Sequence, residues 1–289
     1  MALDYEKIRT WPIPPDTQAF SARDTILYAL GVGVASSNPV EPDNLKFVYE
    51  DGLVALPTMG VTLAPGPFWM QDPATGIEWK KILHGEQMLT VHRPLPPACI
   101  VVSETTVDEI YDKGADKGAV LYQTRKLFDQ SSGDLLMTLR SSAFMRGNGG
   151  FGGNSQGGPQ PHPVPADRRP DLMLDIVTRP EQAVLYRLSG DYNPLHIDPA
   201  VARAGGFDKP ILHGLCSYGI VGRAVLKLLC ANEPARLKRL DVRFASPAYP
   251  GETVRTEIWR ETDGRAAFRA KVVERDVVII NNGLAEYTV

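Results

Sequence analysis

The run YRLSGDYNPLHIDP at residues 186–199 decides how this chain is interpreted, together with GFDKPILHG at residues 206–214. Within the first run, Asp191 and His196 lie five positions apart. Pro194 between them excludes a regular helix. The sequence therefore predicts a loop that brings a carboxylate and an imidazole close together.

A His-Gly pair, His213-Gly214, then opens a long apolar segment that predicts a helix over 214–232. The first N–H groups of a helix have no partner within it, so the N–H of Gly214 is a candidate donor to a developing negative charge. Asn193 tolerates turn conformations and can hydrogen-bond side chains. Carboxylate, imidazole, N–H donor and apolar helix together indicate acid/base chemistry on an acyl group.

Each of these residues also has a purely structural interpretation. Asp191 alone is typical of a turn or a helix cap, and His196 alone is typical of a buried structural histidine. Asn193 serves equally well to hold the turn, and Gly214 to allow close helix packing. We assign no role to His213. The combination of residues, more than any one of them, favours catalysis.

Length and composition limit the classes of protein. The 289 residues allow one large or two medium domains. A net charge of −3 without a Lys/Arg run gives no reason to expect a nucleic acid partner. No apolar run reaches the length of a bilayer span, and residues 1–7 lack a signal-peptide pattern, so we expect no membrane partner and a cytoplasmic location. The cysteines have no paired or metal-like spacing and are expected to be buried thiols.

The first half reads as an extended lead-in, one helix and a set of strands. Residues 1–20 are proline-rich and extended, and 21–31 has helical spacing with a glycine stop. Two strands are expected at 47–49 and 54–59, around a turn. Further strands are expected where β-branched and polar residues alternate, at 88–92, 99–112, 118–129 and 135–144.

A composition break near the middle separates the halves. Residues 146–169 are rich in glycine and proline and read as a surface linker without a function of its own. The second half then repeats the plan, with a strand at 172–178, a helix at 180–188 and the loop described above. A short helix over 199–204, capped by Asp198, is expected inside that loop. Strands follow the apolar helix at 237–245, 253–261, 266–274 and 277–288.

Two short matches indicate duplication. Residues 27–30 (LYAL) resemble 185–188 (LYRL), and 83–85 (LHG) resemble 212–214 (LHG). The register of the first match places Gly33 and Asn38 where Asp191 and His196 stand. We assign no role to His84 in the first LHG triplet, so one active site per chain is expected, in the second half.

On the residues 186–199 and 207–214, the chain resembles the MaoC-like dehydratase family. It is most similar to the two-domain (R)-specific 2-enoyl-CoA hydratases, or hydratase 2, such as the hydratase part of the peroxisomal multifunctional enzyme. Residues 54–58 (VALPT) and 83–87 (LHGEQ) resemble the first domain of that branch.

The resemblance implies an α+β double hot-dog, in which each half is a curved antiparallel sheet wrapped round a central helix. It implies a degenerate domain at 1–145 that shapes the acyl pocket, the linker at 146–169 and a catalytic domain at 170–289. The implied catalytic residues are Asp191, His196, Asn193 and Gly214, with Gly214 as oxyanion donor. It also implies an acyl-CoA thioester substrate, no cofactor, no metal and a homodimer.

Alternatives remain open. The same residues fit a hydratase for a bulky sterol-type or acyl-carrier-protein substrate, a thioesterase, or a non-catalytic acyl-thioester-binding protein. Which of Asp191 and His196 is the base is not assigned. Arg203, Lys209 and Arg243 are candidates for coenzyme A phosphates, although solvated surface charge is the simpler interpretation for each.

Overall fold

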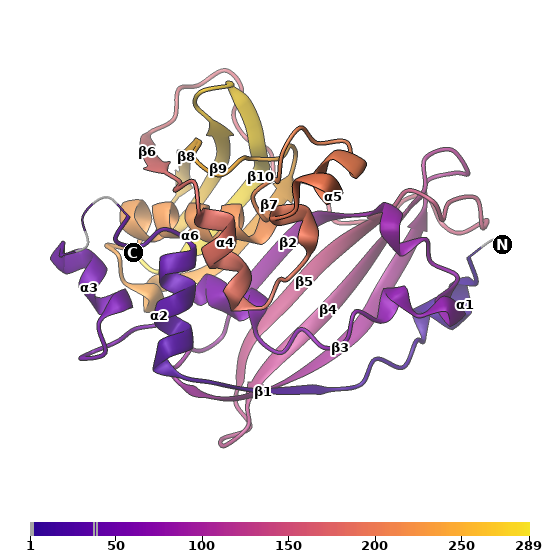
Figure 1. Cartoon of the computed structure of the whole chain (residues 1–289), viewed down its shortest axis with the longest axis horizontal. Helices are drawn as coiled ribbons and strands as arrows, with labels where there is room; N and C mark the ends of the chain where they lie inside the picture. Colours follow the sequence, from indigo (N-terminus) through magenta and orange to yellow (C-terminus); the bar gives the residue numbers. More distant parts are fainter. Residues whose placement is uncertain (1–2, 37, 39) are drawn as a thin grey trace.

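The backbone forms one continuous antiparallel sheet of ten strands. The computed structural model describes residues 3–36, 38 and 40–289 (Figure 1). The strand order is β1-β3-β4-β5-β2-β7-β10-β9-β8-β6. The first five strands of this order come from the first half of the chain and the last five from the second half, and the halves join where β2 pairs with β7. This is the expected α+β double hot-dog.

The first half contains short helices and five strands. Their bounds are α1 Tyr5–Arg9, β1 Asp16–Phe20, α2 Ala22–Gly31, α3 Pro42–Val48, the 3₁₀ helices η1 Pro57–Thr62, η2 Trp69–Gln71, η3 Pro73–Thr75 and η4 Trp79–Lys81, then β2 Ile82–Val91, β3 Cys99–Asp112, β4 Ala119–Asp129 and β5 Leu135–Met145.

The second half places its helices before four of its strands. The bounds are β6 Leu172–Val177, α4 Gln182–Tyr186, η5 Arg187–Ser189, η6 Pro194–His196, α5 Pro199–Ala204, α6 Gly214–Leu229, η7 Pro234–Arg236, β7 Leu237–Phe244, β8 Thr253–Thr262, β9 Arg265–Val272 and β10 Val277–Tyr287.

Helix α6 is the centre of the core. Most of its residues are buried, as its apolar sequence predicted. Two glycines let first-half elements approach it closely. A Cβ on Gly219 would lie 2.4 Å from Cγ1 of Val32, and a Cβ on Gly222 would lie 2.5 Å from Cγ2 of Thr58. The helix of the second half is therefore packed against both halves.

The two strands expected at 47–49 and 54–59 are wrong. Residues 42–48 form α3, which begins with Pro42 in its first turn, and 57–62 form η1, which likewise begins with a proline. Apolar runs this short fit a strand or a buried helical turn equally well. As a consequence, the helical segment that packs on the strands of the first half is the short η1. The strands of the second half pack against the much longer helix α6.

The two short matches differ in the structure: residues 27–30 and 185–188 both lie in helices, whereas the LHG triplets do not share a conformation. Tyr28 in α2 and Tyr186 in α4 are both buried, and their rings lie 6.1 Å apart, so the two helices meet as counterparts (Figure 1). The LHG triplets differ in structure, because 83–85 lies in strand β2 whereas Gly214 begins α6. A tripeptide carries too little information to fix its own backbone conformation.

The glycine-rich connection between β5 and β6 packs on the protein. The carboxylate of Asp112 accepts hydrogen bonds from the N–H groups of Gly150 at 2.8 Å and Gly152 at 2.7 Å. The buried side chain of Asn148 donates to the carbonyl of Gly76 at 3.0 Å. Farther along, the carbonyl of His162 accepts from Asn282 on β10 at 2.7 Å. The connection is thus fixed to both halves.

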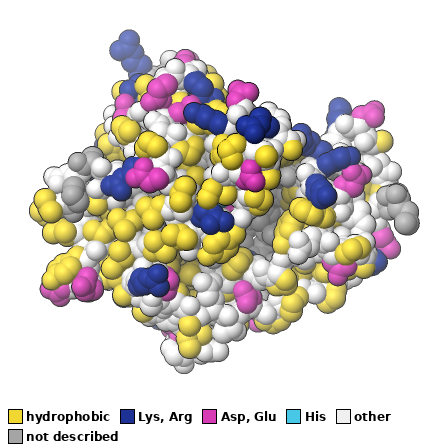
Figure 2. All heavy atoms as spheres, viewed as in Figure 1, with side chains coloured by type: hydrophobic (Ala, Val, Ile, Leu, Met, Phe, Trp, Pro, Cys, Tyr) yellow, Lys and Arg dark blue, Asp and Glu magenta, His cyan; other side chains and the backbone are white. Residues whose placement is uncertain are grey.

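The surface is of mixed charge. Figure 2 shows acidic and basic side chains interspersed over the face in view, without a continuous basic area there. Among the described residues, no helix has the length and apolarity needed to cross a membrane. Cys216 and Cys230 are buried free thiols as expected, and Cys99 is partly buried.

Candidate active site

The loop after α4 is held in shape by its own side chains. Gly190 ends η5 with φ of 115°, a conformation that disfavours other residues. The carboxylate of Asp191 accepts from the N–H of Asn193 at 3.2 Å, and the side-chain oxygen of Asn193 accepts from the N–H of Leu195 at 3.0 Å. Asn193 is exposed and caps η6, so its visible role is to hold the turn.

His196, at the end of η6, is buried with 9% of its surface exposed. Its Nδ1 lies 2.9 Å from the carbonyl oxygen of Ile211. A carbonyl only accepts, so Nδ1 carries the proton and Nε2 of the neutral ring has a free lone pair. Burial lowers the pKa of His196, and the Ile211 bond and the charge of Asp191 oppose that change. The ring is therefore neutral and able to accept a proton near pH 7.

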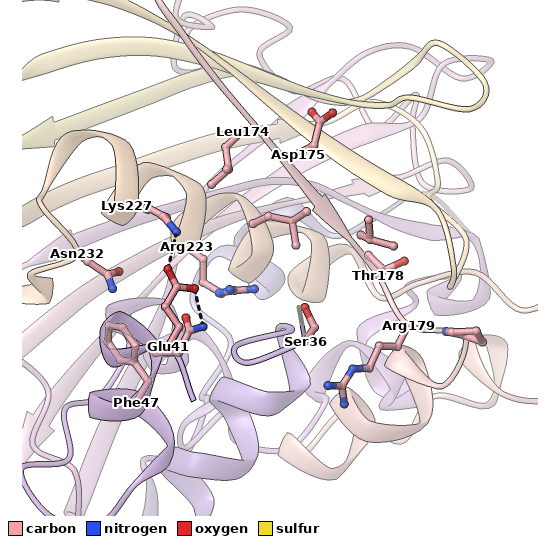
Figure 3. A pocket seen from close by; sticks show the side chains of 14 residues that line it. Ser36, Glu41, Phe47, Leu174, Asp175, Thr178, Arg179, Arg223, Lys227 and Asn232 are labelled. Carbon is pink, nitrogen blue, oxygen red and sulfur yellow. Dashed lines mark hydrogen bonds and ion pairs between the residues drawn. The ribbon is translucent and has the colours of Figure 1, made fainter. Parts of the chain in front are cut away.

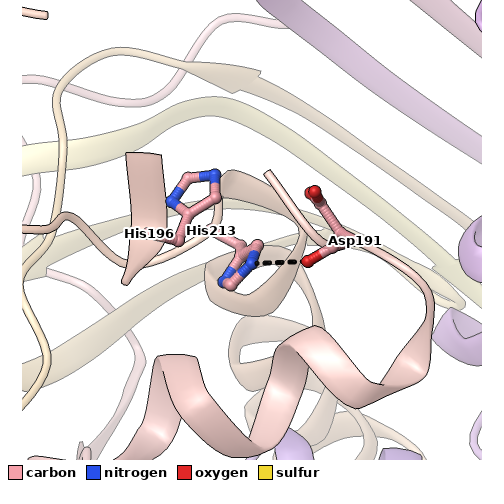
Figure 4. A group of neighbouring side chains, drawn as sticks. All are labelled: Asp191, His196 and His213. Atoms are coloured by element: carbon pink, nitrogen blue, oxygen red, sulfur yellow. Dashed lines mark hydrogen bonds between the residues drawn. The ribbon is translucent and has the colours of Figure 1, made fainter. Parts of the chain in front are cut away.

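His213, to which we assigned no role, is part of the same cluster. Its ring stacks on that of His196 with centroids 3.8 Å apart, and its Nε2 donates to the backbone carbonyl of Asp191 at 3.2 Å (Figure 4). It is 1% exposed, and burial, followed by the neighbouring His196, lowers its pKa to about 4. His213 thus fixes both residues of the expected pair. In the sequence, the signal that could have identified His213 as a site residue is its position one residue before the predicted helix.

Asp191, His196 and His213 form one compact polar site. One side-chain ligand atom from each lies within 4.8 Å of the others. This spacing suits a water molecule held between a carboxylate and an imidazole. It also matches the donor set of a divalent metal ion, so the expectation that no metal is needed stays a prediction.

Gly214 places the start of α6 at this site. It is the first residue of the helix, so its N–H has no partner within the helix. Its backbone is accessible, and a Cβ there would lie 3.4 Å from the ring of Phe244. A contact at 3.4 Å is ordinary van der Waals packing, so packing does not require a glycine here, and the role of the Gly214 N–H as a donor stays a prediction.

An inner cavity of about 230 Å³ adjoins the start of α6. Leu215 and His84 belong to its wall, and most of the rest is apolar and comes from the first half, including Ile13, Val61 and Leu139. The Nε2 of His84 lies 3.1 Å from the carbonyl oxygen of Glu86, and its ring lies 4.9 Å from that of Phe244. His84 is therefore a second histidine that we did not assign; it belongs to the wall of this cavity and is close enough to Asp191 for that charge to act on its ring.

A separate cavity of about 370 Å³ lies between α3, α6 and β6 (Figure 3). In it Lys227 forms an ion pair with Glu41 at 3.5 Å, and Arg223 donates to the carbonyl of Val32 at 3.1 Å. Like the inner cavity, it has no wall residue from the Asp191 cluster, and unlike the inner cavity it has none from the first turn of α6. It is a polar cavity at the contact between the two halves of the chain.

Family models match both halves of the chain. The MaoC-like domain matches residues 162–282, and the MFE-2 hydratase 2 N-terminal domain matches residues 19–147. A probable enoyl-CoA hydratase 2 of Dictyostelium discoideum is 39% identical over 99% of this chain and 97% of its own length. The 3-hydroxyacyl-thioester dehydratase Y of Mycobacterium tuberculosis is 40% identical, with 92% of each chain covered. The mouse peroxisomal multifunctional enzyme type 2 is 40% identical over 95% of this chain, which spans 37% of that enzyme.

Solved structures agree with the fold. A MaoC-like dehydratase from Phytophthora capsici superimposes with a TM-score of 0.85 at 38% identity, covering 98% of each chain. A Mycobacterium tuberculosis protein described as a double hot-dog fold has a TM-score of 0.56 at 12% identity, which supports the fold alone.

The fold and the two family models are those of the hot-dog hydratases and dehydratases. The chain belongs to the MaoC-like dehydratase family, in its two-domain hydratase 2 branch. It is an enzyme of the enoyl-CoA hydratase kind.

Proposed function

We propose that the protein catalyses the reversible hydration of trans-2-enoyl-CoA to (R)-3-hydroxyacyl-CoA. The observation that carries the proposal is the proximity of Asp191 and a neutral His196 within one compact cluster. The substrate is that of the named hydratase 2 relatives, and the (R) product follows from membership of their branch.

The reaction needs one activated water. Asp191 and Nε2 of His196 hold a water between them, and one of the pair removes its proton as the oxygen attacks the β-carbon. The same proton then returns to the α-carbon, so the hydroxyl and the hydrogen of one water molecule are both added. The group that takes the proton from water is the one that delivers it to the α-carbon, so the cycle needs no other acid. Asn193 assists by fixing the loop that carries both groups.

The start of α6 stabilises the intermediate. Attack at the β-carbon moves negative charge to the thioester oxygen, which becomes an enolate oxygen. The N–H of Gly214 donates to that oxygen, supported by the dipole of α6. By analogy with other oxyanion donors, this hydrogen bond lowers the barrier by about 3–4 kcal/mol.

The inner cavity is the proposed acyl pocket, built mainly by the degenerate first domain (1–145) beside the catalytic domain (170–289). A bulky sterol-type acyl group or an acyl-carrier-protein substrate would use the same pair of residues, and both remain alternatives. The proximity of Asp191 and His196, together with the exposed Gly214 that follows His213 of the same cluster, argues for an enzyme over a passive binder.

The direct test mixes purified protein with crotonyl-CoA and with a longer trans-2-enoyl-CoA and follows the loss of enoyl absorbance. Asp191→Asn and His196→Gln should each lose most of the activity while the protein stays folded. Full activity in either variant would remove that residue from the mechanism. Free thiol released without hydration would identify a thioesterase, and chiral analysis of the product tests the (R) assignment.

Three further expectations accompany the proposal. No cofactor is required, the assembly is a homodimer, and the location is cytoplasmic. The location needs its own measurement, because relatives from mouse and Arabidopsis thaliana are named peroxisomal. Light scattering of the purified protein tests the dimer.

A further inference from the structure

The cavity of about 370 Å³ between α3, α6 and β6 has no part in the proposed reaction, and it shares no wall residue with the inner cavity. Its walls come mainly from α3 of the first half and from α6, β6 and residues 178–180 of the second half (Figure 3). Its volume falls within the range of small-ligand sites, roughly 300–1,000 Å³. The contact between the halves thus contains a space large enough for a small molecule.

Arg223 on α6 brings a positive charge into this cavity. Figure 3 shows its side chain extending from α6 in the direction of Ser36. A guanidinium has five N–H donors, and one of them is used by the carbonyl of Val32 at 3.1 Å. Burial lowers the pKa of Arg223 to about 10, although the charge of Glu41 opposes that change.

Among the described residues, no carboxylate lies within 4.0 Å of the Arg223 side chain. The two acidic residues of the wall are instead engaged with other cations. Glu41 forms the ion pair with Lys227 at 3.5 Å. Asp175 accepts two hydrogen bonds from the guanidinium of Arg255, both at 2.7 Å. Arg223 is therefore a partly buried cation without a counter-ion in contact.

A second arginine of the wall is in the same situation. Arg179 follows β6, and among the residues that the structure describes its side chain also has no carboxylate within 4.0 Å. Together with Lys227, the wall has three basic side chains against two acidic ones. A guanidinium matches a planar carboxylate in a geometry that allows two parallel hydrogen bonds. The charge of the wall therefore suits an anion with a single negative charge.

The wall also has an apolar part. Phe47 of α3 and Leu174 and Ile176 of β6 belong to it, and Phe47 and Ile176 are buried. Leu174 and Ile176 are two positions apart on one strand, so their side chains lie on the same face of the sheet. Pro180 extends this apolar surface. An apolar group on the ligand would cover these side chains, and the burial of apolar area would favour binding.

We propose that this cavity binds a small organic carboxylate, with its charged group on Arg223 and Arg179 and its apolar body against Phe47. The inference does not depend on the proposed hydration, because no wall residue takes part in that reaction. A doubly charged phosphate is disfavoured, since the two wall acids already supply negative charge. The bound carboxylate contacts α3 of the first half and α6 of the second, and so stabilises the contact between them.

Calorimetric titration with hexanoate tests the site. Hexan-1-ol has the same chain without the charge, and inorganic phosphate has the charge without the chain. At constant ionic strength, the protein should bind hexanoate at least about tenfold more tightly than either, a difference of about 1.4 kcal/mol. Failure to bind millimolar hexanoate would overturn the inference. Equal binding of hexan-1-ol would mean that apolar surface alone holds the ligand, and tighter binding of phosphate would exclude a carboxylate site.

Two variants locate the bound hexanoate. Arg223→Gln removes the charge but keeps an N–H donor for the carbonyl of Val32, and Arg179→Gln removes the other cation. Each should weaken hexanoate binding by about tenfold or more. Neither arginine belongs to the inner cavity, so hexanoate bound there would not respond to them. Arg260→Gln, at an exposed arginine of β8 outside the wall, is the matched control. Unchanged affinity in both wall variants, or the same loss in the control, would overturn the inference.

Thermal unfolding gives a second measurement. A ligand that binds only the folded chain raises Tm, and hexanoate at a hundred times its Kd should raise the Tm of the wild type by about 5 °C. The same concentration should raise Tm about half as much in a variant that binds tenfold more weakly. Melts without ligand check that each variant folds, and Arg179→Gln carries the test if Arg223→Gln does not fold. Equal rises in the wild type and the wall variants would contradict the proposed site.

Discussion

The imidazole of His213 is stacked on that of His196 at 3.8 Å, with 29° between the ring planes, and it also donates to the backbone carbonyl of Asp191. One buried side chain thereby touches both members of the proposed catalytic pair. Two stacked imidazoles disfavour each other's protonation, and burial acts in the same direction. His213 is a positioning residue in this arrangement, since its Nε2 is used by the backbone.

Replacing His213 should impair the chemical step more than substrate binding. His213→Ala removes the stacked ring and the donor to Asp191, and a misplacement of about 1 Å costs up to 10²-fold in rate. We expect kcat to fall by about that factor with KM little changed. His213→Asn keeps an N–H donor and should recover part of kcat. A thermal melt of each variant checks folding, and equal losses in both variants would show that the hydrogen bond does not matter.

The pH profile should report the lowered pKa of His196. The ring acts in its neutral form, which is lost as pH falls through its pKa in the protein. Because burial lowers that pKa from 6.5, activity should persist below pH 6.5 and decline only at lower pH. Measuring kcat/KM from pH 4 to 9 gives the midpoint. A midpoint above pH 6.5 would mean that His196 is stabilised in its charged form instead.

Protein stability should fall in the same acidic range. The pKa of His213 is about 4 in the folded protein against 6.5 for an ordinary histidine, so the unfolded chain binds more protons between these values. The free energy of unfolding should decrease as pH falls from about 6.5 towards 4, by on the order of 2–3 kcal/mol for this group. Urea unfolding at a series of pH values measures the decrease, and His213→Asn should reduce it.

Zinc should inhibit, and a chelator should not. Asp191, His196 and His213 offer ligand atoms within 4.8 Å of one another, so Zn²⁺ competes with the catalytic water for the same groups. We expect full activity after prolonged dialysis against EDTA and loss of activity on adding micromolar zinc. His213→Ala should weaken zinc binding measured by calorimetry. Loss of activity in EDTA, restored by metal, would contradict the metal-free mechanism.

Close packing around Gly219 should make a larger side chain costly. A Cβ there would lie 2.4 Å from Val32 and 2.8 Å from the hydroxyl of Tyr28, so Gly219→Val should lower the free energy of unfolding by about 3 kcal/mol. Lys227→Val introduces the same residue at a half-exposed position of α6 and should cost below about 1 kcal/mol. Chemical denaturation compares the two. Similar losses would mean that helix propensity, more than packing, decides the result.

Local patterns were enough to predict the elements with strong signals. The range 99–112 matches β3, and the short helix 199–204 matches α5, with the carboxylate of Asp198 accepting from the N–H of Ala200 at 2.7 Å. The apolar helix begins at Gly214 as predicted and ends three residues earlier, at Leu229. Alternation, caps and helical spacing are carried by neighbouring residues, so they are visible in one sequence.

Contacts between distant segments were not predictable in this way. His84 lies beside Phe244, and within reach of the charge of Asp191, only because β2 pairs with β7. No local pattern distinguishes His84 or His213 from structural histidines. The connection at 146–169 has the composition of a free linker, yet Asp112, in the first half, binds two of its N–H groups. The fixed conformation of this connection depends on hydrogen bonds to residues elsewhere in the chain.

The pairing of β2 with β7 joins two hot-dog halves within one chain, and this affects how their sequences can diverge in evolution. Two separate hot-dog subunits that form the same sheet would carry every substitution twice, once in each copy. In this chain each half is encoded independently, so the helix over the first sheet can shorten to η1 while α6 keeps its full length. If the proposed site in the second half is the active one, joining the subunits in one polypeptide gives up a second catalytic centre and leaves the first half free to change in shape.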